Sequence, residues 1–171
     1  MTIRPATEHD LPEILRIYNH AVEHTTAVFE YRPHTIEMRR EWFRVKQAAS
    51  LPVLVAGDVD SVRGFVTYGP FRAWPAYKYS VEHSVYVDPA AHRQGIGSAL
   101  VRAVLDEARA RNLHVVMAGI TSDNVASLRL HEKLGFTEVA HIPEVGYKFG
   151  GWLDLKFLQI VLDGPRQPTD A

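Results

Sequence analysis

The spacing of apolar residues along the chain predicts helices and strands in a definite order. A short strand at residues 2–4 comes before two helices, for which Thr7 and Thr35 are the N-terminal capping residues, and a loop at 25–33 joins these helices. The apolar side of the first helix is Leu11, Ile14, Leu15, Tyr18 and Val22. The apolar side of the second is Ile36, Met38, Trp42, Phe43 and Val45, and its Arg39 and Arg40 are expected on the solvated face.

The middle of the chain reads as strands around one helix. Segments 52–56 and 62–68 predict an antiparallel pair joined by a turn at 57–60. Residues 80–87 alternate as a further strand, and a helix follows at 98–111, with Asn112 as its left-handed C-terminal residue. Residues 114–120 are almost continuously apolar, which predicts a strand covered on both faces.

The last third of the chain completes the predicted sheet. Ser122 or Asp123 caps a helix that ends at Gly135, and strands follow at 136–141 and 156–162. The order β-α-α-β-β-β-α-β-α-β-β predicts an α/β protein with a mixed central sheet and helices on both faces. We expect one domain over residues 1–163 and a flexible tail at 164–171, which is rich in Pro, Gly and polar residues.

A glycine-bearing turn joins the strand at 80–87 to the helix after it. Its sequence at 92–97 is His-Arg-Gln-Gly-Ile-Gly. Such a turn points several backbone N–H groups at one place, where the helix dipole is also positive. Gly95 and Gly97 carry no Cβ, so a ligand can approach the backbone closely. The turn therefore predicts a site for a phosphate or pyrophosphate group, and so a phosphate-bearing cofactor.

Composition narrows the class of protein. The 171 residues are 46% apolar and 23% charged, which is ordinary for one globular domain. The net charge of −1 disfavours nucleic acid as a partner. Since no apolar run approaches about 20 residues and no leader is evident, we expect a cytoplasmic protein without a membrane partner. The chain has no Cys, and His9, His20 and His24 lack a ligand arrangement, so no metal site is expected.

Three further segments make the pattern specific. They are Val-Glu-His-Ser-Val-Tyr-Val at 81–87, Asn124 followed by Leu-Arg-Leu-His-Glu-Lys-Leu-Gly-Phe at 128–136, and Gly-Tyr-Lys-Phe-Gly-Gly-Trp-Leu-Asp at 146–154. With the glycine turn they resemble the GNAT superfamily, and within it the phosphinothricin and methionine sulfoximine N-acetyltransferases. The resemblance covers about residues 2–163 and implies the GNAT-like acyl-CoA N-acyltransferase fold. One departure is His92, which stands where the superfamily usually has Arg or Gln.

The resemblance implies an activity and its co-substrate. The expected reaction moves acetyl from acetyl-CoA to the α-amine of a small amino-acid-like molecule of the phosphinothricin or methionine sulfoximine type, in a homodimer. Because no Cys can carry the acyl group, transfer should be direct, in a ternary complex. The implied acetyl-CoA contacts are Val85, Tyr86, Val87, Arg93, Gln94, Gly95, Ile96, Gly97, Ser98 and Asn124. A backbone N–H of 85–87 would polarise the thioester, although an ordinary buried strand has the same residue types.

Glu82 and His131 are the candidate catalytic residues. A carboxylate between Val81 and Val85 is costly unless it is hydrogen-bonded or useful, and spacing alone leaves base and structural roles equal. The resemblance implies that Glu82 is the general base, acting through water. His131 follows Asn124 by seven residues, so both lie on one helix side about 10 Å apart along the axis. The alternatives are a His131 bonded between helix and sheet, and an Asn124 that only caps the helix.

The implied amine site combines a loop and a strand: Arg72, Ala73, Trp74, Glu82, His83 and Ser84. Arg72 could pair with a substrate carboxylate, although an exposed loop arginine is the commoner case. Phe29 and Trp74 could wall the pocket. His83 points away from Glu82 across the strand, so it is not counted as a second base. The segment 146–154 is implied to lie near the active site and the subunit contact.

Other functions remain open. A protein N-terminal or other amine acetyltransferase would need an open groove, which bulky Phe29 and Trp74 disfavour. A silent acyl-CoA-binding module would keep the glycine turn but could dispense with Glu82 and His131. A nucleotide-binding domain is disfavoured because the P-loop Lys-Ser/Thr and the longer Gly-x-Gly-x-x-Gly pattern are both missing.

Overall fold

The structure is a computed structural model that describes residues 1–58 and 61–170. The order of helices and strands is the predicted one. In chain order the elements are β1 (Ile3–Pro5), α1 (Leu11–His24), α2 (Ile36–Ala48), β2 (Val53–Asp58), β3 (Ser61–Pro70), β4 (Ser80–Val87), α3 (Ile96–Ala110), β5 (Val115–Thr121), α4 (Val125–Lys133), β6 (Thr137–Lys148) and β7 (Gly151–Val161). Short 3₁₀ turns lie at Glu8–Asp10, Pro75–Tyr77 and Pro89–Ala91. The predicted turn at 57–60 includes Val59 and Asp60, which lie outside the described residues.

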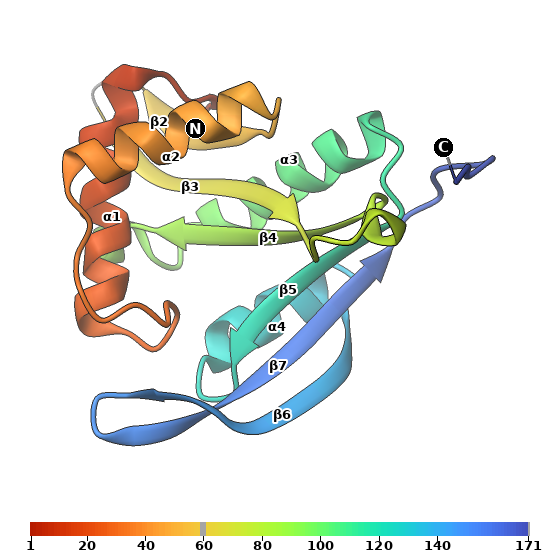
Figure 1. The fold of residues 1–171 in the computed structure, drawn as a ribbon. Coiled ribbons are helices and arrows are strands. Elements are labelled where there is room, and N and C mark those ends of the chain that lie inside the picture. Colours follow the sequence, from red (N-terminus) through yellow and green to blue (C-terminus); the bar gives the residue numbers. More distant parts are fainter. Residues whose placement is uncertain (59–60, 171) are drawn as a thin grey trace.

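The strands form one mixed sheet in the order β1-β2-β3-β4-β5-β7-β6. Neighbouring strands are antiparallel except for the central pair, β4 and β5. That pair is joined at three positions only, the last of which is Glu82 opposite Met117. Figure 1 shows the consequence, because β4 and β5 separate beyond this point like the arms of a V.

Helices cover both faces of the sheet, as the sequence predicted. On one face α1 and α2 pack through Ile14, Ile17 and Phe43 against β2 and β3. On the other face α3 packs its fully buried Leu100 and Val104 against the sheet, with α4 beside it (Figure 1). Burying these apolar side chains contributes most of the stabilisation of such a layered domain. The two layers hold β4 and β5 in place on either side of the gap between them.

Helix starts differ from the sequence expectation in three places. Helix α1 begins at Leu11 with Asp10 at its N-cap, and Thr7, expected to cap this helix, caps the 3₁₀ turn before it. Helix α3 begins at Ile96 rather than at residue 98, because Gly95 is the N-cap at φ +77°. Helix α4 is capped by Asn124, not by Ser122 or Asp123, and the Asn124 side chain accepts a hydrogen bond from Ser127 N. Asn is among the best N-cap residues because its short side chain reaches the free N–H groups of the first turn. Asn112 does adopt the predicted left-handed conformation, at φ +54°.

The exposed face of α2 was predicted wrongly in part, because Arg40 is exposed as expected but Arg39 is not. Arg39 is 2% exposed, with its guanidinium 4.1 Å from the Tyr18 ring and 4.6 Å from the Trp42 ring. Met38 and Val45, expected on the buried side, are about half exposed. Stacking between two aromatic rings compensates the burial of the guanidinium, and a pattern of apolar residues cannot anticipate that exchange.

The C-terminal strands are longer than predicted. β6 and β7 form one hairpin that turns at Phe149 and Gly150, which have φ of +52° and +80°. In the tail, the Gly164 carbonyl accepts a hydrogen bond from His114 Nδ1. None of the helices in residues 1–58 and 61–170 combines the length and apolar character needed to cross a bilayer.

Candidate active site

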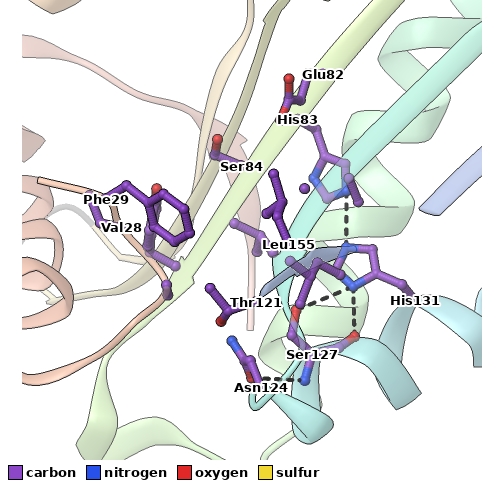
Figure 2. A pocket seen from close by; sticks show the side chains of 16 residues that line it. Val28, Phe29, Glu82, His83, Ser84, Thr121, Asn124, Ser127, His131 and Leu155 are labelled. Carbon is purple, nitrogen blue, oxygen red and sulfur yellow. Dashed lines mark hydrogen bonds between the residues drawn. The ribbon is translucent and has the colours of Figure 1, made fainter. Parts of the chain in front are cut away.

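A cavity of about 300 Å³ lies where β4 and β5 separate. Its walls come from five parts of the chain. These are the loop residues Ala27, Val28 and Phe29, the β4 residues Glu82 to Tyr86, the end of β5 at Ala118 to Thr121 with Leu155 of β7, and Asn124, Ser127 and His131 at α4. Figure 2 shows the labelled side chains around it, with Phe29, Glu82 and Ser84 apart from the α4 group.

Glu82 stands at the point of divergence. It is the last β4 residue paired with β5, and within the described chain no protein group donates a hydrogen bond to its half-buried carboxylate. Burial raises the pKa of Glu82, and the nearby charge of Arg72 opposes that rise. Gly119 makes room for the carboxylate, because a Cβ there would be 2.8 Å from Glu82 Oε1. The carboxylate is therefore available to a ligand in the cavity.

His83 and His131 form a buried pair whose hydrogen bonds assign both tautomers. Their Nε2 atoms are 3.0 Å apart, and His131 Nδ1 is 2.7 Å from the carbonyl oxygen of Ser127. A carbonyl only accepts, so Nδ1 carries the proton of His131. Burial lowers the pKa of both rings, that of His83 to about 3, so both are neutral. His131 Nε2 must then accept from His83 Nε2–H.

The pair leaves one nitrogen unused. His83 Nδ1 is unprotonated, buried and without a hydrogen-bond partner among the described residues. His131 has no unused nitrogen, because one bonds to the Ser127 carbonyl of α4 and the other to His83 of β4. This is the arrangement of a histidine bonded between helix and sheet. Both rings line the cavity, and Phe136 packs against them at ring-centroid distances of 5.6 and 5.1 Å.

The turn before α3 leaves several backbone donors free. In the described chain, the N–H groups of residues 94–98 donate to no protein acceptor, and the first helix bond runs from Ala99 N to Gly95 O. Gly95 has a left-handed φ of +77° and faces open space where its Cβ would be. Together with the helix dipole, these donors form a cradle that suits a phosphate group.

The second glycine of the turn has a packing role that the sequence analysis did not anticipate. A Cβ on Gly97 would lie 2.9 Å from Leu130 Cδ1, so this glycine permits close packing of α3 on α4. Two side chains of the turn bond to the protein itself. His92 Nε2 donates to Val87 O at 3.2 Å, and Gln94 accepts from Arg63. Backbone groups, rather than these side chains, are what the turn offers a ligand.

The predicted substrate loop does not line the cavity. Arg72, Ala73 and Trp74 are exposed, and Trp74 is 70% accessible. The Arg72 guanidinium stacks on Phe71, 4.1 Å from its ring, and donates to Phe71 O. Phe29, expected as a wall, does line the cavity. The predicted residues of β4, from Glu82 to Tyr86, line it as well.

Sequence reasoning missed the contributions of Thr121, Ser127, Leu155 and Gly119. Only Gly119 carried a signal, since a single glycine inside an apolar strand marks a close approach by another group. The described residues contain no group of three His, Asp or Glu side chains that could hold a metal ion. The cradle and the cavity instead fit an extended ligand with a phosphate at one end and a reactive group at the other.

Comparisons with known proteins agree with this geometry. The family model described as acetyltransferase (GNAT) matches residues 12–136. An L-methionine sulfoximine/L-methionine sulfone acetyltransferase of Salmonella typhimurium is 46% identical, over 98% of both chains. A phosphinothricin N-acetyltransferase of Streptomyces coelicolor is 41% identical, over 92% of this chain and 94% of that one. The structure of a phosphinothricin acetyltransferase from Sinorhizobium meliloti in complex with acetyl-CoA superposes with a TM-score of 0.93 at 32% identity, covering 98% of this chain and 92% of that chain.

Proposed function

The chain belongs to the acetyltransferase (GNAT) family and is an N-acetyltransferase, and on that premise we propose that it acetylates the α-amine of a small amino-acid-like molecule with acetyl-CoA. Relatives more than 40% identical are named for methionine sulfoximine, methionine sulfone and phosphinothricin, so we propose substrates of that class. The observation that carries the proposal is the cavity at the divergence of β4 and β5, with the unbonded Glu82 carboxylate at its apex.

Glu82 is the proposed general base. An α-amino group has a pKa of about 8, so roughly a tenth of it is neutral at pH 7 and modest assistance is enough. Glu82 would take the proton of the ammonium form, directly or through one water. Burial supports this role, because the raised pKa of Glu82 brings its proton affinity closer to that of the amine.

The remaining steps use the backbone and the histidine pair. The C–N bond forms, the C–S bond breaks, and the proton released by the attacking nitrogen ends on sulfur. We propose that an N–H of residues 85–87 on the free edge of β4 polarises the thioester carbonyl. Because His131 has no unused nitrogen, we assign it a positioning role that acts through His83.

The proposed acetyl-CoA site begins at the cradle. The N–H groups of residues 94–98 would hold the diphosphate, with Arg93 exposed beside them. At the other end, Asn124 uses its Oδ1 as a helix cap, so its Nδ2 is the atom left for a ligand. Arg72 stays the proposed partner of the substrate carboxylate. Its positive charge acts on Glu82, and its guanidinium would have to leave the Phe71 ring to contact a substrate in the cavity.

We also propose a homodimer, formed through the tip of the β6–β7 hairpin. Tyr147, Phe149 and Trp152 are 49%, 62% and 63% exposed there, and Tyr31, 71% exposed, donates to Tyr147 O. A gathering of large apolar side chains on one surface is typical of a protein contact. Sedimentation should show a dimer, and Trp152→Lys should shift it to monomer. A monomeric wild type would refute this assignment. The cytoplasmic location stays a prediction from sequence.

A turnover assay tests the activity. The protein is incubated with acetyl-CoA and a panel of methionine sulfoximine, phosphinothricin, the common amino acids and short peptides, and released thiol is measured. Release with the first two compounds supports the proposal. Release with peptides alone would indicate a protein N-terminal acetyltransferase. Calorimetric binding of acetyl-CoA without release from any amine would indicate a silent binding module.

A further inference from the structure

Lys148 is a buried cation that binds the loop at 25–33. Its side chain is 5% exposed, and its Nζ donates to three backbone oxygens, those of Val22, Thr25 and Val28, at 2.6, 2.9 and 2.7 Å. Val22 lies in the last turn of α1, where carbonyls lack helical partners and the helix dipole is negative. Lys148 therefore uses all three of its donors to join the end of α1 and the loop to β6.

A second contact between the same strand and loop involves Gly146. A Cβ on Gly146 would lie 2.3 Å from Phe29 Cε2, so the Phe29 ring rests directly on the backbone of β6. Gly146 does not have the positive φ that would itself require glycine. The three atoms nearest to such a Cβ all belong to the Phe29 ring, so the requirement for glycine comes from Phe29. Tyr31 adds a third contact, from its hydroxyl to Tyr147 O at 2.8 Å.

The loop held in this way forms one side of the cavity. Ala27, Val28 and Phe29 line it together with Glu82 and Ser84. Val81, Val85 and Val87 of β4 pack in the same core as α3, so Glu82 and Ser84, which alternate with them, share the opposite side of the strand. The proposed phosphate cradle belongs to α3. Phe29 is 46% exposed, and its ring lies across the cavity from the α4 residues, on the same lining as Glu82 and Ser84 (Figure 2).

We propose that Lys148 and Gly146 are positioning residues for the amine substrate, because together they fix Phe29 as the wall that sets which amines fit beside Glu82. This inference rests on the proposed function for the identity of the site. The clamp itself, β6 holding the loop at 25–33, can be measured without any reaction. An experiment can therefore refute the clamp and the proposed function independently of each other.

The test compares Lys148→Met with Lys156→Met, a β7 lysine that pairs with Glu138 at the surface. Hydrogen exchange of the peptide covering 25–33 should be faster by about tenfold in Lys148→Met and unchanged in the control, because three carbonyls lose their donor. The KM for the amine should rise about fivefold or more, with the KM for acetyl-CoA within about twofold.

Gly146→Ala supplies a second variant if Lys148→Met fails to fold, with Gly151→Ala, which has open space at its Cβ, as its control. Gly146→Ala should show the same two changes, and adding Phe29→Ala should return the exchange rate to the wild-type value. Unchanged exchange in both variants would overturn the clamp. Faster exchange with unchanged amine KM would overturn the substrate role. Absence of any turnover in wild type would refute the proposed function and leave the exchange result standing.

Discussion

The Nε2 atoms of His83 and His131 lie 3.0 Å apart in a contact closed to solvent, and the Ser127 carbonyl on the far side of His131 decides which ring donates. A chain of hydrogen bonds runs from strand β4 through two imidazoles to helix α4. Its other end is the buried His83 Nδ1, which has no hydrogen-bond partner among the described residues. The sequence, which places these residues 48 positions apart, gave no sign of this pairing.

The tautomers can be observed directly. Imidazole ¹⁵N spectra near neutral pH should show His131 protonated at Nδ1 and His83 protonated at Nε2, because the carbonyl fixes the first and the first fixes the second. His83 should stay neutral well below the ordinary histidine pKa, since burial lowers its pKa to about 3, and burial lowers the pKa of His131 as well. A doubly protonated His83 near pH 6 would contradict the assignment.

The same burial makes stability depend on pH. The pKa of His83 falls from 6.5 to about 3, so between these values the unfolded chain binds a proton that the folded chain does not. The contribution of neutral His83 to the free energy of unfolding is thus fully present above about pH 6.5, and it is lost progressively as the pH falls toward 3. Between about pH 7.5 and about pH 5.5 one such residue removes about 1.4 kcal/mol of unfolding free energy.

Urea titrations of His83→Gln at the two pH values check this. The variant should lose about 1.4 kcal/mol less than wild type over that interval, because glutamine does not titrate. His9→Gln, at an exposed position, is the control and should follow wild type. An identical pH dependence in wild type and His83→Gln would show that His83 titrates alike in both states.

Glu82→Gln should lower kcat/KM for the amine by about 10²-fold or more near pH 7, because glutamine cannot take the amine proton. In wild type, the rate should fall as the pH drops through the pKa of Glu82, and burial places that limb above the ordinary carboxyl value of 4.5. Glu138→Gln, at the surface beside Lys156, should retain full activity. Full activity of Glu82→Gln would remove Glu82 from the role of base.

Gly95 and Gly150 share the same left-handed backbone conformation, so alanine variants at the two positions can distinguish an effect on acetyl-CoA binding from an effect on stability. Gly95 and Gly150 have φ of +77° and +80°, and both face open space. Alanine at either position should cost about 1 kcal/mol of unfolding free energy. Only Gly95→Ala should weaken calorimetric binding of acetyl-CoA, by about tenfold, because its methyl would occupy space over the cradle donors. Equal affinities of the two variants would place the diphosphate elsewhere.

Periodicity was enough to predict much of the fold. The alternation in β4 and the helical spacing in α1 and α3 follow from local geometry and burial, so they are visible in the chain itself. The glycine turn was visible for the same reason, since a left-handed Gly95 before a helix is a local requirement. Arg39 shows the limit of this reasoning. Its burial depends on Tyr18, which lies on another helix.

The sequence by itself thus determined the order of the elements, the glycine turn before α3, and the strand that carries Glu82. Only the tertiary structure decided that His131 is committed to His83, that Trp74 lies outside the cavity, and that Lys148 holds the loop of Phe29. The physical reason is that propensity and pattern act over a few neighbouring residues. Hydrogen-bond partners and cavity walls are instead fixed where strands and helices distant in sequence meet.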